Sequence, residues 1–144
     1  MFSAASQAVS ESSGTVNVTV NVTGTTSASI ISVPYVVSGD AANPADHDLA
    51  SGTLNIPAGA TSAQISFTLV DDLISEATET VILTMGTVTN ATKGATVVHQ
   101  VDVNDNEGLP TANFSAGSQS FSEASGAATI TVNLSNASSS SITV

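Results

Sequence analysis

The sequence predicts an all-β protein: an antiparallel β-sandwich of about seven strands, followed by the first strands of a second tandem copy. Three observations lead to this prediction. Apolar and polar residues alternate with period two in several segments, as on half-buried strands. Hydrophobic residues make up 41% of the chain and charged residues only 9%, so Ser, Thr, Asn and Gly must fill exposed positions, which is unusual on helix surfaces. A segment near the N-terminus also recurs near the C-terminus.

Strand positions follow from the alternation and from the turn residues between apolar runs. In residues 14–23, Val16, Val18, Val20 and Val22 share one face and Thr and Asn the other. Gly and Pro lie at most joints, and no segment has a convincing helical period. An immunoglobulin-like order of seven strands results. We expect them at residues 2–10, 14–23, 28–37, 52–56, 62–70, 79–85 and 95–104.

The repeat pairs FSAASQAVSESSGTVNVTVNVT, which begins at Phe2, with FSAGSQSFSEASGAATITVNLS, which begins at Phe114. About half of the positions are identical without a gap. Matching Glu11 to Glu123 gives a period of 112 residues (123 − 11), which is the size of one β-sandwich domain. We therefore expect one domain at 1–110 and the start of a second, incomplete repeat at 111–144. This is the pattern of a piece of a tandem array.

Charge and cysteine content exclude several classes of function. Lys93 is the only Lys or Arg, against twelve acidic residues and a net charge of −11. Without a basic patch, nucleic acid and anionic membrane surfaces are excluded as partners. No apolar run approaches the roughly 20 residues of a membrane span, so no membrane insertion is expected. The absence of cysteine excludes disulfides and thiolate metal sites and suits an extracellular protein held together by other means.

The acidic residues gather at one predicted end of the sandwich. In such a fold, the first, third, fifth and seventh strands end at the same pole, and nine of the twelve acids follow these strands. Close carboxylates repel by roughly 1 kcal/mol per pair in water, so a cation is expected among them. Oxygen ligands without cysteine favour Ca²⁺, with room for two or more ions, over soft metals or Mg²⁺. The nine are Glu11, Asp46, Asp48, Asp71, Asp72, Glu76, Glu79, Asp105 and Glu107.

Three segments resemble the Calx-beta domain, which occurs in sodium/calcium exchangers and large bacterial surface proteins. The segment ADHDLASGTLNIPAGATSAQISFTLVDDLISEATETVILTMG is similar to the central signature of that family. SESSGTV resembles its opening Glu and Gly, and VDVNDNEG resembles its closing strand and acidic cluster. The resemblance covers residues 1 to about 108.

This resemblance implies a set of calcium ligands. In calcium-binding members the ligands lie at the acidic positions, which here are Glu11, Asp46, Asp71, Asp72, Glu76, Glu79, Asp105 and Glu107. Two departures matter. His47 occupies the position of a family Tyr, and Asn104 and Asn106 stand where strong binders carry more acids. Neutral amides contribute no charge, so we expect affinity in the extracellular range, about 10⁻⁴ to 10⁻³ M.

No arrangement of residues predicts catalysis, so the chain is not expected to be an enzyme. There is no G-x-S-x-G motif, and neither histidine has a placed Ser and Asp partner. We expect His47 to pack its ring in place of the Tyr, rather than to act as a pH-sensitive group. His99 falls in the apolar register of its strand and is expected at the core edge with a hydrogen bond.

The leading functional hypothesis is a calcium-binding structural module of a secreted or cell-surface repeat protein, bacterial in origin. It would serve as an adhesin stalk or spacer in which Ca²⁺ stiffens the junction between repeats. Its partners would be neighbouring copies of the same repeat. One alternative is a homopolymer, a filament joined by strand exchange through residues 111–144. A less favoured alternative is a calcium-sensing regulatory domain, as in the exchangers.

Overall fold

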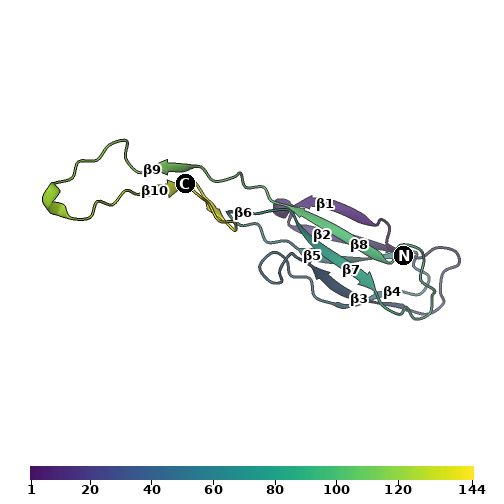
Figure 1. Cartoon of the computed structure of the whole chain (residues 1–144). Coiled ribbons are helices and arrows are strands. Elements are labelled where there is room, and N and C mark those ends of the chain that lie inside the picture. The colour runs from purple at the N-terminus through teal and green to yellow at the C-terminus, as the bar shows by residue number, and fades with distance from the viewer. The chain divides into compact units, whose positions relative to one another are not determined.

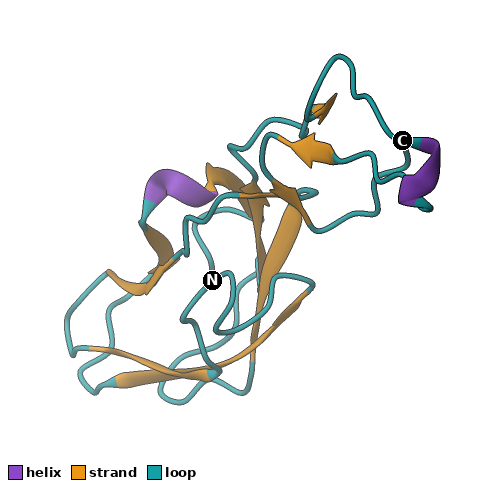
Figure 2. Cartoon of the chain, turned by 90° about the vertical axis from the view of Figure 1, so that its left-hand side faces the viewer, coloured by secondary structure: helices purple, strands orange, loops and turns teal.

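The computed structural model describes all residues, 1–144, and divides the chain into two compact units. The first unit comprises Met1–Asp71 and Ala77–Asn106, and the second comprises Asp72–Glu76 and Glu107–Val144. Strands and loops make up both units, and helix is confined to two 3-10 turns, η1 (Glu11–Ser13) and η2 (Glu123–Ser125) (Figure 2). Neither turn has the length or apolar character of a membrane-spanning helix.

Two facing sheets build the first unit (Figure 1). The smaller sheet pairs β2 (Thr15–Asn21) with β5 (Ser62–Thr68) in antiparallel fashion. The larger sheet has the strand order β1-β8-β7-β3-β4. Its strands are β1 (Ser6–Ser10), β8 (Val98–Asn104), β7 (Glu79–Met85), β3 (Ile31–Gly39) and β4 (Gly52–Ile56). The predicted all-β sandwich is confirmed.

Alternation along each strand places one apolar face in the core. Val16, Val18 and Val20 on β2 are each no more than 2% exposed, while Asn17 between them is exposed. The facing strands contribute alternate residues in the same way, including Leu83 on β7. Burying one such aliphatic side chain stabilises the fold by about 1.5–3 kcal/mol. These interdigitated rows hold the two sheets together.

The first predicted strand, residues 2–10, is a single strand in the prediction but two segments in the structure. Phe2 bridges Val20 in the smaller sheet, and β1 then pairs with β8 in the larger sheet. The pair β1–β8 is parallel, the one exception in an otherwise antiparallel sandwich. The prediction was wrong here because a chain that changes sheets keeps its apolar alternation, so sequence alone does not reveal the crossing.

The second unit contains two short strand pairs. β9 (Ala112–Phe114) pairs antiparallel with β10 (Val132–Leu134). β6 (Ile74–Ser75), which the sequence did not predict, pairs parallel with β11 (Ala137–Ser138). The second copy therefore forms local hairpin structure, and it also pairs with residues from the connection between β5 and β7.

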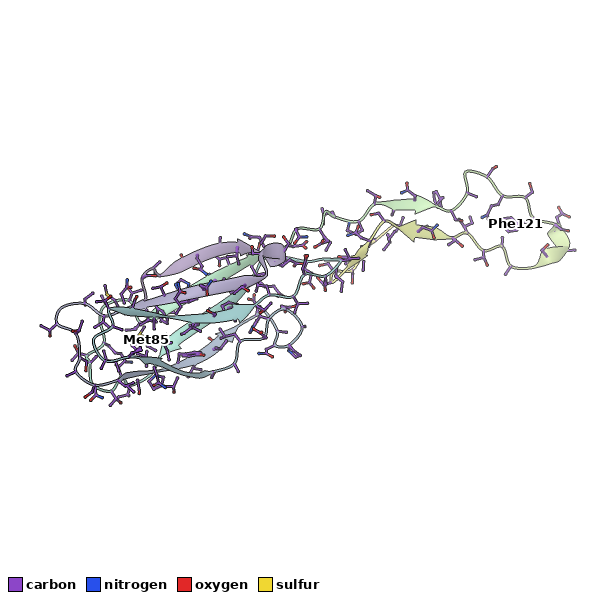
Figure 3. The ribbon with its side chains drawn as sticks, turned by 180° about the vertical axis from the view of Figure 1, so that it is seen from behind. Met85 and Phe121 are labelled. Carbon is purple, nitrogen blue, oxygen red and sulfur yellow. The ribbon has the colours of Figure 1, made fainter.

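Burial separates the two units clearly. Met85 in the first unit is 4% exposed, whereas Phe121 in the second is 50% exposed (Figure 3). Phe114, Ile130 and Leu134 are exposed as well, at 67%, 66% and 44%. The second copy thus shows its apolar side chains to solvent, because strands that would cover them are not part of this unit.

Candidate metal centre

The predicted acidic pole exists in the first unit, where several strand ends are joined by hydrogen bonds. The amide of Leu69, after β5, donates to the carbonyl of Gly14 at 2.9 Å. The amide of Val70 donates to the carbonyl of Asp46 at 2.9 Å. The ends of β7 and β8 meet through Thr78 and Asn104, whose side chains lie 3.1 Å apart. The segments that follow β1, β3, β5 and β8 therefore converge, as the strand directions require.

Glu11 and Asp71 form the first carboxylate pair of this pole. One carboxylate oxygen of each lies within 4.8 Å of the other. Glu11 opens the turn η1 and is only 7% exposed, while Asp71 is exposed. The turn ends at Gly14, whose φ of 69° is a conformation that favours glycine. The two carboxylates offer oxygen ligands of the kind that a hard cation takes, so this pair suits a bound cation.

Asp46 and Glu79 form the second pair, also within 4.8 Å, and both are half-buried. Asp46 lies in a tight turn in which its amide donates to the carbonyl of Ala42 at 2.8 Å and its carboxylate accepts from the amide of Ala42. Glu79 is the first residue of β7. A rigid turn and a strand end thus bring together two acids that lie far apart in sequence.

The other predicted ligands are distributed over both units. Asp105 directly follows β8 in the first unit and is half-buried. Asp72 and Glu76 flank β6 in the second unit, where the Asp72 carboxylate accepts from the amide of Ile74 at 2.7 Å. Glu107 is the first residue of the long second-unit segment and is half-buried.

Asp40 is a polar residue at this pole that the sequence prediction missed. Its carboxylate accepts from the hydroxyl and the amide of Thr80, the latter at 2.6 Å. The hydroxyl and then the amide of Thr80 lower the pKa of the Asp40 carboxyl below its ordinary value. The signal that could have found it is its place directly after Gly39, at the end of β3. Asp48 acts similarly, accepting from the amide of Thr68 at 2.7 Å.

The single basic side chain lies at the opposite pole. The Lys93 ammonium donates to the carbonyl of Met85 at 2.9 Å, and Met85 ends the strand that Glu79 begins. A strand of seven residues spans roughly 20 Å, so Lys93 does not serve the acidic pole. Loops at its own end are joined by the amide of Gly59, which donates to Ser27 at 2.9 Å.

Both histidines are buried in the first unit, each 2% exposed. Nδ1 of His47 accepts from the amide of Leu49 at 3.1 Å, and its ring packs edge-on against Phe67 with centroids 6.0 Å apart. His99 Nδ1 lies 2.8 Å from the carbonyl of Ala4, so that nitrogen carries the proton and donates. Both rings therefore pack, as the sequence suggested, and neither belongs to the acidic pairs.

The donor set at the acidic pole fits a hard divalent cation. Carboxylate oxygens of Glu11, Asp71, Asp46 and Glu79 are the oxygen ligands that Ca²⁺ prefers. Oδ1 of Asn106 accepts from the hydroxyl of Ser10, the residue before Glu11, at 3.4 Å. The chain has no cysteine that would favour a softer metal.

Comparisons with known proteins agree with the fold. Among solved structures, the calcium binding domain CBD12 of CALX1.1 is similar, with a TM-score of 0.66, 24% identity, and coverage of 74% of this chain and 44% of that one. The apo-form Calx CBD1 domain is similar with a TM-score of 0.66 and 21% identity, and the match covers 74% of this chain and 95% of that one. The Calx CBD2 domain has a TM-score of 0.63 and 14% identity, with coverage of 73% of this chain and 85% of that one.

At these identities the structural likeness establishes the fold. This chain spans less than half of the CALX1.1 structure that it resembles. No curated protein matches the sequence. A family model described as the Calx-beta domain matches residues 1–107, most of the chain. The chain therefore belongs to the Calx-beta domain family.

Proposed function

We propose that this chain is a calcium-binding structural repeat of a secreted or cell-surface protein of bacterial origin, without enzymatic activity. Bound Ca²⁺ would stiffen the junction between consecutive repeats. The observation that carries the proposal is the convergence of two carboxylate pairs, Glu11 with Asp71 and Asp46 with Glu79. They lie at the pole where β8 ends and the chain continues towards the second copy.

Family membership and electrostatics support calcium as the ion. A similar solved structure is described as a calcium binding domain. The chain has a net charge of −11, and its lysine lies at the other pole, so a divalent cation would relieve repulsion among the acids. Asn104 and Asn106 supply neutral oxygens in place of charged ones, which predicts a Kd of about 10⁻⁴ to 10⁻³ M.

Thermal unfolding with and without Ca²⁺ tests the metal site. At 10 mM, Ca²⁺ is about 10- to 100-fold above this Kd, so an ion that binds only the folded state stabilises it by about 1.4–2.7 kcal/mol. The Tm should therefore rise by roughly 5–15 °C. Mg²⁺ at the same concentration should do much less. The double variant Asp71→Asn and Asp72→Asn, which removes two predicted ligands, should lose the calcium-dependent rise in Tm. Equal responses to Ca²⁺ and Mg²⁺, or none, would refute the calcium site.

A second candidate function is a filament joined by strand exchange, and one observation favours it. Phe114, Ile130 and Leu134 are exposed in the second copy. Strands from a neighbouring chain could pair with the edges of this copy and complete a sandwich that covers these side chains. Light scattering should then detect polymers of the full chain that disappear in the variant Phe114→Ser, Ile130→Ser. A chain that stays monomeric at millimolar concentration would contradict this candidate.

A further inference from the structure

The starting observation is a backbone contact between consecutive copies of the repeat. Ile74 and Ser75, from the connection between β5 and β7, pair in parallel with Ala137 and Ser138 of the second copy. The amide of Ser139 also donates to the carbonyl of Ser75 at 3.2 Å. All of these residues belong to the second unit. The connection from one repeat therefore adds a short strand to the next.

The repeat period identifies the equivalent surface on the first copy. Subtracting 112 residues places Ala137 and Ser138 at Thr25 and Thr26, and Ser139 at Ser27. Thr25 and Thr26 are exposed and belong to no strand. Ala137 and Ser138 of the second copy therefore pair with a strand, whereas their equivalents Thr25 and Thr26 in the first copy do not.

We propose that the loop at 23–27 of the complete repeat is a docking surface for a second copy of the same repeat placed ahead of it in tandem. The occupant is that copy's segment 73–75, which would pair with Thr25 and Thr26 in the register seen for Ala137 and Ser138. The inference deepens the proposed function, since it rests on tandem arrangement, but it does not require calcium.

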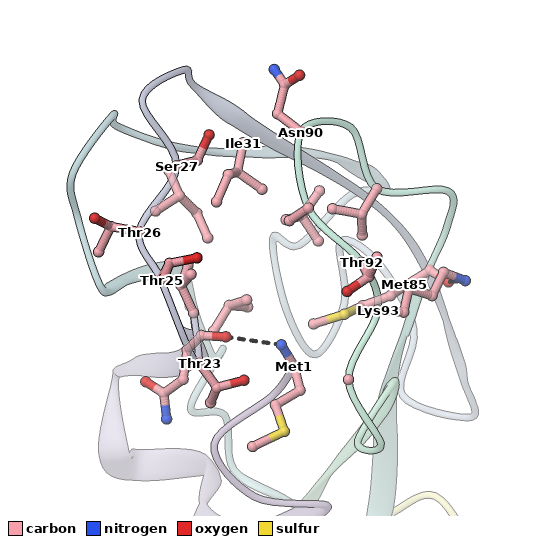
Figure 4. Close-up of a pocket in the computed structure, with 18 residues that line it drawn as sticks. Met1, Thr23, Thr25, Thr26, Ser27, Ile31, Met85, Asn90, Thr92 and Lys93 are labelled. Atoms are coloured by element: carbon pink, nitrogen blue, oxygen red, sulfur yellow. Dashed lines mark hydrogen bonds between the residues drawn. The ribbon is translucent and has the colours of Figure 1, made fainter.

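The shape of this pole fits the occupant. A cavity of about 340 Å³ opens beside the loop, lined by Thr23, Thr25 and Thr26 together with Ile31 and other apolar residues (Figure 4). In the second unit, a groove lined by Ser135 and Ala137, the equivalents of Thr23 and Thr25, also includes Leu73 and Ile74. Leu73 is 77% exposed, so it is an apolar side chain available to enter the cavity.

Charge favours the same partner. Lys93, the only Lys or Arg in the chain, lines the cavity (Figure 4). The segment that would dock is flanked by Asp71, Asp72 and Glu76. Complementary charge guides and orients such contacts. Lys93 of one repeat is therefore opposite in charge to the acidic connection of the copy ahead of it.

Disulfide trapping in a tandem chain tests the contact, because the native chain has no cysteine to interfere. Residues 1–112 are joined directly to 1–144, which reproduces the native spacing. Ser75→Cys is placed in the first copy and Thr26→Cys in the second. Paired positions on neighbouring strands lie about 5 Å apart, within disulfide range. Under mild oxidation in chelator, this pair should link about 10-fold faster than a matched pair with Ala58→Cys at the same pole.

Two controls make every outcome informative. The pair Ile74→Cys and Ala137→Cys in the native chain should link readily, because the structure pairs these residues. The reduced tandem variants should unfold at the same temperature as their parent. Equal linking rates for Thr26→Cys and Ala58→Cys, or no linking of either, would overturn the docking surface. The Ca²⁺-dependent Tm of the native chain is measured separately, so failure of the calcium site and failure of the contact are distinguishable.

Discussion

Residues 2–21 and residues 114–133 are two copies of one motif, one inside a complete sandwich and one outside. Their local geometry is the same. Gly14 has φ 69° and ψ −105°, and Gly126 has φ 73° and ψ −109°. Phe2 bridges Val20, and Phe114 pairs with Val132 in the equivalent register. The turn and the pairing therefore occur both inside and outside the complete sandwich.

Equivalent side chains of the two copies differ strongly in burial, although the backbone geometry is the same. Phe2 is 1% exposed and Phe114 is 67% exposed. Glu11 is 7% exposed, whereas its counterpart Glu123 is exposed. The core, and the burial of the candidate ligand, therefore depend on the remaining strands of the sandwich rather than on the motif.

The largest effect is expected from truncating the aromatic residue in each copy. Phe2→Ala should cost about 3–5 kcal/mol of the free energy of unfolding, because it removes a fully buried ring. Phe114→Ala should cost no more than about 0.5 kcal/mol, as for other exposed positions. Urea unfolding followed by the fluorescence of Tyr35, the only Tyr in a chain without Trp, reports on the first unit. Equal losses of unfolding free energy in the two variants would contradict the difference in burial between Phe2 and Phe114.

The second comparison separates the two equivalent glutamates. Glu11→Gln should remove most of the calcium-dependent stabilisation, which is about 1.4–2.7 kcal/mol at 10 mM Ca²⁺, because it removes a charge from the pair with Asp71. Glu123→Gln should leave the calcium response unchanged. Calcium titrations monitored by Tm measure both. An unchanged response in Glu11→Gln would exclude Glu11 as a ligand.

The third comparison concerns the two turn glycines. Each has a positive φ, and an added Cβ would meet no atom within 4 Å at either position, so only backbone strain distinguishes Ala from Gly. Gly14→Ala should cost about 1–3 kcal/mol of the stability of the first unit. Gly126→Ala should leave that transition unchanged, although it strains the same turn. Differential scanning calorimetry measures both, and a similar loss from the two variants would show that the second copy supports the first.

The smallest effect is expected from Asp40, which has no counterpart in the second copy before Val144. Hydrogen bonds from Thr80 lower its pKa in the folded state, so its stabilising contribution is present above the ordinary pKa of the unfolded chain. That contribution is lost as the pH falls through the lowered value. Asp40→Asn and Thr80→Val should both flatten the loss of stability below about pH 4. Unfolding free energies measured from pH 2 to 6 test this, and unchanged acid sensitivity in both variants would contradict it.

The sequence predicted most of the fold because alternation and turn residues are local signals. β4 and β7 begin and end where predicted, between clear Gly, Pro and acidic punctuation. It missed β6, since a two-residue strand pair with β11 exists only through a contact 63 residues away along the chain (137 − 74). It also missed the change of sheet after Phe2, which alternation cannot reveal.

The sequence could predict that the acidic residues share one end of the sandwich, but not which carboxylates lie close to each other. Strand direction alone placed the acids together. That Glu11 approaches Asp71, and Asp46 approaches Glu79, depends on turn conformations such as the one in which the Asp46 amide donates to Ala42. The hydrogen bond from the amide of Thr80 on β7 to the Asp40 carboxylate requires the loop after β3 to approach β7. No sequence pattern indicates this approach.

The parallel pairing of β1 with β8 has a mechanical consequence. β1 lies near the start of the first unit and β8 at its end, and five residue pairs join them in parallel, from Ser6 with Gln100 to Ser10 with Asn104. When a tandem chain is pulled from both ends, the force acts on the N-terminal end of β1 and on the C-terminal end of β8. Because the two strands are parallel, these forces pull them past each other in opposite directions. Force then loads all of the hydrogen bonds of this pair together in shear, rather than opening them one at a time. The strand that changes sheets thereby acts as a clamp against extension.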